Sequence, residues 1–331
     1  MPARRFRDLA ERISEVPTPV GGLALGIVSL GLAWERLLPG TRLAEIATVI
    51  AAVLLLLLSL RFVLHPATLS RDFANPVMGG VLATYAMGWM LVAICAAQVS
   101  HLAWAVLWLF GFGVHIVFLS LFFRNRMVHF ELTHMVPSWF IPPVGIIAAA
   151  VSYRGPHEGG LFLLAVFALY FGMTTYALML PVMFYRFIFA ENVGVAAMPT
   201  LAILAAPASL SLTGYLSLLD DPQPLPVILL MGISVLMTTI VYVAFIRLLV
   251  LPFSPGFAAY TFPLAIGATA LFEAAEELEG HVSKKLVNQT HGLAVFELLV
   301  ATAVAAYVTV RFCRFAWTHW RTAFVQEQGE G

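Results

Sequence analysis

The stretch Phe73–Phe123 reads FANPVMGGVLATYAMGWMLVAICAAQVSHLAWAVLWLFGFGVHIVFLSLFF and contains no aspartate, glutamate, lysine or arginine. A helix that crosses the hydrocarbon core of a bilayer needs about 20 largely apolar residues. The stretch is therefore long enough for two membrane-spanning helices, joined by a tight turn near Gln98–His101. It predicts a membrane protein that is built from helical hairpins.

The composition of the whole chain agrees with this prediction. Of its 331 residues, 61% are hydrophobic and only 11% are charged, whereas soluble domains carry about 25% charged residues. These values exclude a soluble enzyme and a disordered chain. The 18 basic and 18 acidic residues cancel, so we expect no nucleic acid among the partners. Cys95 and Cys313 lie in apolar runs and form neither a CxxC motif nor a disulfide framework.

The intervals between charged residues predict an all-α membrane protein with ten transmembrane helices. The expected spans are residues 19–38, 42–64, 76–98, 101–123, 137–153, 159–185, 199–219, 225–249, 254–278 and 288–312. Residues 17–314 then form the transmembrane domain, between a cytoplasmic segment 1–16 and a cytoplasmic tail 315–331. The first segment is amphipathic and has no cleavage site, which favours an interfacial helix over a signal peptide.

The basic residues predict the orientation of these spans. If the N-terminus is inside, the outer segments hold only five of the 18 lysines and arginines, namely Arg36, Arg42, Arg154, Lys284 and Lys285. The other 13 (18 − 5) lie on the inner side. Positive charge accumulates on the cytoplasmic side of membrane proteins. We therefore expect both termini in the cytoplasm and a location in the bacterial inner membrane.

Prolines recur in the odd-numbered spans. They are Pro19, Pro76, Pro142, Pro207 and Pro263, with separations of 57, 66, 65 and 56 residues. This period fits one helical hairpin per repeat. A proline kinks a helix and frees a carbonyl that protein or water must satisfy. We therefore expect the odd helices inside, lining a central pore. The alternative is close packing at the small residues beside each proline, which are common in membrane helices.

Two carboxylates fall within the predicted spans, whereas no lysine or arginine lies in the middle of an odd span. Glu297 lies in the middle of the tenth span, and Glu273 lies near the outer end of the ninth. Glu297 is interpreted as paired with a neighbouring helix, as protonated, or as part of a proton route. A path between the odd helices would be neutral, which permits an anion pore without requiring one.

Glu273 opens an acidic cluster at the predicted outer end of the ninth span. The cluster could repel external anions, bind a cation, or be a solvated helix end that the nearby lysines neutralise. Its other members are Glu276, Glu277 and Glu279, followed by Lys284 and Lys285.

No constellation of residues predicts catalysis. His129 and His134 form an H-x4-H pair, but the other histidines are dispersed over both sides of the membrane. The chain has no Walker motif, glycine-rich phosphate loop or nucleophile elbow. We therefore expect no metal, no cofactor and no enzymatic activity.

The predicted ninth span carries the most specific motif. Ala259–Ala265, AYTFPLA, resembles the Tyr-Thr-Phe-Pro signature of the tellurite-resistance/dicarboxylate transporter family. That family includes TehA-like bacterial proteins, yeast malate and sulfite carriers, and the slow-type anion channels of plant guard cells. Pro17–Trp34, Pro137–Gly145 and Ala206–Ala208 are similar to the family's first, fifth and seventh helices.

The resemblance implies five helical hairpins around a quasi-five-fold axis, with the odd helices inside. It also implies a homotrimer with a separate pore in each subunit. Phe262, which precedes Pro263, would plug the pore as its gate, with Gly22 opposite its ring. The further candidates for the pore lining are Gly79, Gly80, Gly145, Ser209 and Thr213.

The sequence therefore favours an inner-membrane channel or channel-like transporter for small inorganic anions, surrounded by membrane lipid. One alternative is a proton-coupled carrier of C4-dicarboxylates or an exporter of sulfite or tellurite-related oxyanions, with the glutamates carrying protons. A pH gradient would drive only the coupled carrier. Another alternative is a scaffold or sensor without flux, in which a Phe262→Ala variant would remain as impermeable as the wild type.

Overall fold

The computed structural model describes residues 11–128 and 130–329, together with the side chains of 11–126, 128 and 130–318. These residues form helices and loops, and no strand occurs among them. The first hairpins comprise α2 (Val20–Leu37), α3 (Leu43–Leu64), α4 (Pro66–Ala74), α5 (Met78–Val81), α6 (Ala83–Ala96) and α7 (His101–Met127). The middle of the chain comprises η1 (Leu132–His134), η2 (Pro137–Phe140), α8 (Ile141–Val144), η3 (Gly145–Ile147), α9 (Ala148–Val151) and α10 (Gly159–Phe189). The last third comprises η4 (Val195–Ala205), α11 (Ala206–Leu218), α12 (Pro224–Leu248), η5 (Pro255–Tyr260), α13 (Thr261–Glu277) and α14 (Lys284–Gly329).

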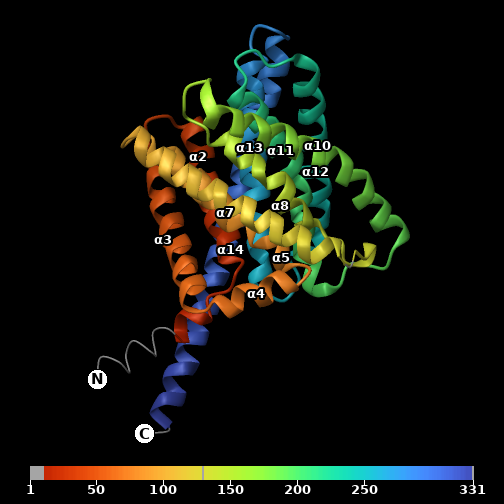
Figure 1. Ribbon diagram of the computed structural model, residues 1–331. Coiled ribbons are helices and arrows are strands. Elements are labelled where there is room, and N and C mark those ends of the chain that lie inside the picture. The colour runs from red at the N-terminus through yellow and green to blue at the C-terminus, as the bar shows by residue number, and fades with distance from the viewer. Residues whose placement is uncertain (1–10, 129, 330–331) are drawn as a thin grey trace.

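Nine helical segments in this described part are long and apolar enough to cross a membrane. The expected span 137–153 is the shorter apolar run Pro137–Val151, which is broken into several short helices. The all-helical, multi-pass membrane fold is thus confirmed, while the count of ten spans and the five-fold arrangement stay predictions. The expected tail 315–331 is not separate from the last span, because α14 continues without a break to Gly329 and projects beyond the bundle (Figure 1).

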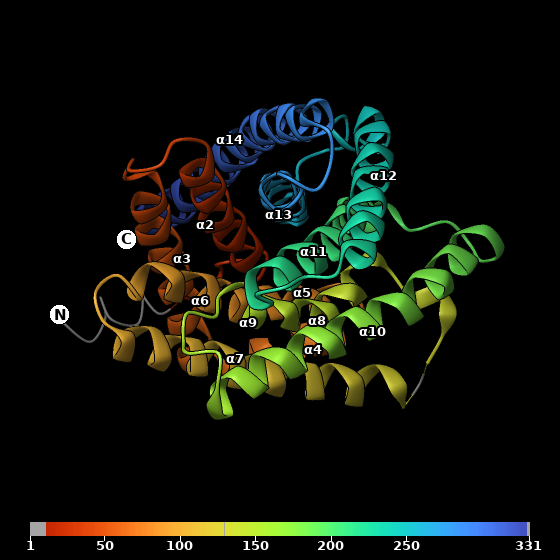
Figure 2. The same cartoon turned by 90° about the horizontal axis from the view of Figure 1, so that it is seen from above.

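The helices form an inner and an outer layer. Viewed from above, α3, α7, α10, α12 and α14 lie at the periphery, and α2, α6, α9, α11 and α13 lie between them (Figure 2). In their most apolar windows, the inner segments of membrane length are 61% to 94% buried, against 22% to 39% for the outer helices. The outer helices expose large apolar side chains such as Val63, Leu178 and Ile246. Such surfaces are stable in contact with lipid tails.

We call α2, α5–α6, η2–α9, η4–α11 and η5–α13 the five inner segments. Three of them begin as 3-10 helices, and their prolines lie just after the change to an α-helix, at Pro142, Pro207 and Pro263. The expected kinks at Pro19 and Pro76 are wrong, because these prolines precede α2 and α5 and so begin the helices. Proline suits that place, since a first-turn N–H has no partner within its helix.

Three arginines fasten the hairpins at the end of the bundle where the inner segments begin, which we call the proline end. Arg61 lies in the last turn of α3. Its Nη1 donates to the Thr18 hydroxyl (2.6 Å), just before α2. Arg126 donates through Nη2 to the carbonyl of Ala74 (2.6 Å), ahead of α5. Arg186 donates to the carbonyl of Thr133 (3.1 Å), ahead of η2. Each of these three outer helices, α3, α7 and α10, thereby ties its last turn to the start of the inner segment in its own hairpin.

Candidate functional site

The axial cavity lies between the five inner segments, toward the proline end. Its volume is about 60 Å³, and every inner segment contributes to its wall. A space of this size holds a few water molecules at most. Two hydroxyl-bearing residues, Thr84 and Thr200, belong to the wall, but each hydroxyl donates to a carbonyl of its own helix at 2.7 Å. The wall is therefore apolar and offers no free hydroxyl donor.

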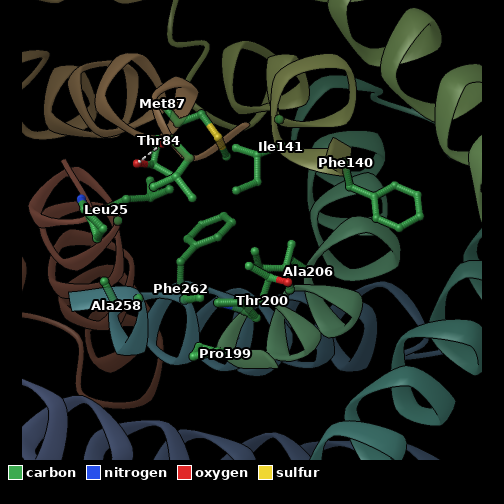
Figure 3. Close-up of a pocket in the computed structure, with 18 of the residues that line it drawn as sticks. Leu25, Thr84, Met87, Phe140, Ile141, Pro199, Thr200, Ala206, Ala258 and Phe262 are labelled. Carbon is green, nitrogen blue, oxygen red and sulfur yellow. Dashed lines mark hydrogen bonds between the residues drawn. The ribbon is translucent and has the colours of Figure 1, made fainter. Parts of the chain in front are cut away.

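Phe262 is the wall residue whose side chain projects into this cavity. It is the second residue of α13, and its ring projects from that helix toward Met87, Ile141 and Ala206 (Figure 3). The ring is 7% exposed. Phe140 also belongs to the wall, but its ring points away from the centre of the cavity (Figure 3) and packs edge-on against Tyr176 of α10. An aromatic ring in an apolar constriction excludes water and ions.

The start of α13 holds the Phe262 ring in place. The neighbouring Thr261 hydroxyl donates to the carbonyl of Ala258 (2.8 Å) and lies 3.3 Å from the carbonyl of Gly22 on α2. Gly26, one turn further along α2, lies so close that a Cβ atom there would overlap the Thr261 side chain. α2 and α13 therefore pack against each other directly beside the ring.

A second space, the charged cavity, lies at the other end of the inner segments and has a volume of about 220 Å³. α2, α6, α11 and α13 contribute to both cavities. The wall of the charged cavity includes Arg36, Arg154, Glu35 and Glu273, so its basic and acidic groups balance. The Arg154 guanidinium donates to the carbonyls of Val151 (3.0 Å) and Tyr153 (2.6 Å). Burial lowers the pKa of Arg154, and the neighbouring Glu273 carboxylate opposes that shift.

Glu273, which was predicted as a charge site, forms an ion pair in the charged cavity. Its carboxylate pairs with Arg36, which also binds Glu276 at 3.0 Å. The Glu273 side chain is 7% exposed, whereas that of Arg36 is 36% exposed. Neutralisation of the cluster by Lys284 and Lys285 was one reading of the sequence; among the described residues the recorded partner of Glu273 and Glu276 is Arg36, which belongs to α2. The pair thus ties the far end of α13 to α2.

The other predicted carboxylate, Glu297, lies away from the axis. It lines neither cavity and is only 2% exposed. No hydrogen bond to its Oε2 atom is recorded among the described residues. The expected partner on a neighbouring helix is therefore not found in this part of the chain.

Only some of the predicted lining residues reach a cavity. Gly22 and Gly145 line the axial cavity and Thr213 lines the charged one, while Gly79, Gly80 and Ser209 line neither. Gly79 and Gly80 lie against the backbone carbonyls of Phe73 and Ser138. The Ser209 hydroxyl bonds that of Ser234 on α12 at 2.7 Å. These three small residues allow helices to approach closely, which is the alternative that the sequence left open.

Sequence reasoning missed the apolar wall and the arginines of the charged cavity. Met87, Ile141 and Ala206 are ordinary in membrane helices, so no local signal marks them. Arg36 and Arg154 were counted only as outer charges. No cluster of three or more potential metal ligands occurs among the described residues. His129, one half of the histidine pair, lies outside the described residues, and His134 is half-exposed beside Glu131.

Comparison with known proteins places these features in context. The family model described as voltage-dependent anion channel, SLAC1, matches residues 20–321. Two uncharacterized transporters of Methanocaldococcus jannaschii are each 25% identical to the chain, over 236 and 227 residues. The alignments cover 65% and 62% of this chain, and 69% and 65% of the two relatives.

Proposed function

Because this chain belongs to the voltage-dependent anion channel family, we propose that it conducts small monovalent anions across the bacterial inner membrane, with Phe262 as the gate. Family membership supports an anion channel or transporter in general. The observation that carries the finer proposal is the Phe262 ring, which projects into the axial cavity between all five inner segments.

The charges along the axis permit the passage of anions. No carboxylate lines the axial cavity, so no group there would hold a cation. At the other end, Arg36 and Arg154 offset Glu35 and Glu273. An anion would therefore meet an apolar path with weak binding, which suits rapid passage.

Flux measurements on the wild-type protein in liposomes test the proposal against a coupled carrier. We expect slow chloride and iodide flux that follows an imposed voltage and needs no pH gradient. Cation flux under the same voltage should stay at the level of empty liposomes. Uptake of malate that requires a pH gradient, without voltage-driven halide flux, would contradict the channel and support a proton-coupled dicarboxylate carrier.

The orientation is also a proposal, with both termini in the cytoplasm and the charged cavity facing outward. Cys95 is half-buried in the wall of that cavity. In a Cys313→Ser background, we expect a membrane-impermeant thiol reagent to label Cys95 in right-side-out vesicles and not in inverted ones. Labelling only in inverted vesicles would reverse the topology, and a Cys95→Ser variant controls for other targets.

The family resemblance further leads us to propose a homotrimer with one pore per subunit. The mass of the detergent-solubilised particle measures this directly.

A further inference from the structure

Glu297 belongs to a group of buried oxygen atoms that have no hydrogen-bond partner among the described residues. They are Glu297 Oε2 on α14, and Thr238 Oγ1 and Tyr242 Oη on α12. The Thr238 side chain is 1% exposed. Buried polar atoms are normally satisfied, and unpaired ones in native proteins mark bound solvent, bound ions or function.

Two of these oxygens, together with the Ser209 hydroxyl, converge on one point of the gate helix. A Cβ atom built on Gly267 of α13 would lie 2.7 Å from Glu297 Oε2, 3.7 Å from Thr238 Oγ1 and 3.8 Å from Ser209 Oγ. The three side chains come from α14, α12 and α11. We call Glu297, Thr238, Tyr242, Ser209 and Gly267 the polar nest.

The polar nest contains no positive charge to balance a carboxylate. No ion pair of Glu297 is recorded among the described residues, and the titratable group that faces it is the Tyr242 phenol. On α2 and α13, Glu35, Arg36 and Glu273 line the charged cavity instead, and Glu276 and Glu277 lie in the last turn of α13. α11 contributes Tyr215, whose hydroxyl accepts from the Gln223 N–H. On α14 itself, the His291 ring contacts Phe272.

A charge in such a place is costly. An unpaired carboxylate that is buried within the membrane loses its hydration, and nothing replaces that hydration unless a cation, a proton or water arrives. Because the Glu297 carboxyl group packs tightly against Gly267, the described conformation favours the neutral, protonated form of Glu297 over the carboxylate.

We propose that the polar nest is a proton-binding site whose occupancy controls the Phe262 gate. Gly267 and Phe262 lie on the same helix, about one and a half turns apart. When Glu297 releases its proton, the carboxylate is stabilised only if water enters the polar nest, which requires α13 to move away from α14. The closed state, in which α13 packs against α14, therefore binds the proton more tightly than the state in which α13 has moved away. By linkage, raising the pH favours displacement of α13 and release of the ring.

The proton site itself is tested without any flux measurement. In infrared difference spectra between about pH 6 and about pH 9, we expect wild-type protein to lose the carbonyl band of a protonated, buried carboxyl group. Glu297→Gln should lack this change, and Glu297→Asp should retain it. Glu45→Gln, which removes an exposed carboxyl group from the first turn of α3, should behave as the wild type. A band that persists unchanged in Glu297→Gln would overturn the proton site.

The coupling to the gate rests on the proposed function and is tested by halide flux over the same pH range. Wild-type flux should rise with pH, roughly tenfold for each pKa unit by which the two states differ. Glu297→Gln should stay closed at all pH values, and Glu45→Gln should follow the wild type. A pH response that survives in Glu297→Gln would overturn the coupling. If Phe262→Ala conducts nothing while the Glu297 band titrates, the proposed function fails and the proton site stands.

Discussion

Replacement of Phe262 by alanine is expected to turn a nearly closed protein into an open anion pathway. The ring projects into an apolar cavity between the inner segments, where only about 60 Å³ of empty space remains beside it, so its removal widens the passage where the wall has no free donor to hold an ion. Each 1.4 kcal/mol that is removed from a barrier increases the rate about tenfold. We therefore expect iodide efflux from liposomes to rise at least about tenfold at fixed voltage.

A matched control comes from another inner segment. Phe140→Ala removes the same ring from η2, but that ring packs against Tyr176 and points away from the cavity. The Phe140→Ala variant should lose about 3 to 5 kcal/mol of unfolding free energy, as is usual for a buried phenylalanine. It should not open the path. A folded Phe262→Ala variant that stays as impermeable as the wild type would contradict the gate and favour a scaffold or sensor.

A large effect on stability is also expected from Gly26→Ala. The added methyl group would overlap the Thr261 side chain and reach within 3.0 Å of the Phe262 backbone nitrogen. Because Thr261 is fixed by its hydrogen bond to the carbonyl of Ala258, α2 and α13 must separate. Overpacking of a tight core costs about 1 to 3 kcal/mol and occasionally more, and this contact involves backbone. We expect the free energy of unfolding to fall by about 3 kcal/mol. A lower unfolding temperature in detergent would show this loss.

Gly22→Ala is the control for this prediction, since it lies one turn earlier on the same helix. Its methyl group would meet the Ala258 Cβ at 3.5 Å, which is an ordinary van der Waals distance. We expect little change in the unfolding temperature. Equal unfolding temperatures for the two variants would show that the close approach of α2 and α13 does not limit stability.

Particular residues show where sequence reasoning succeeded. The uncharged run Phe73–Phe123 and its counterparts predicted membrane helices to within a few residues, because the cost of burying a charge in lipid acts on each segment separately. The prolines pointed to the inner segments, since a break in a helix needs neighbours that satisfy its carbonyls. These two signals are local, and one chain is enough to read them.

Other assignments failed or were missed because they depend on which way a helix faces. In α6, α11 and α12 the polar and apolar residues are not segregated to separate faces, so these sequences carry little amphipathic signal to orient the helices. Gly80 and Ser209 pack against neighbouring segments, whereas Gly145 and Thr213 each line a cavity. The sequence alone could not distinguish the first pair from the second.

The sequence by itself thus determined that this chain is an all-helical membrane protein of helical hairpins, since transfer into lipid is a property of each segment. Only the tertiary structure decided that the Phe262 ring enters the axial cavity while Phe140 points away. The tertiary structure also decided that Arg36 pairs with Glu273 and that Glu297 meets Gly267 and Thr238. Those relations join residues from different helices, and helix packing rather than local composition brings them together.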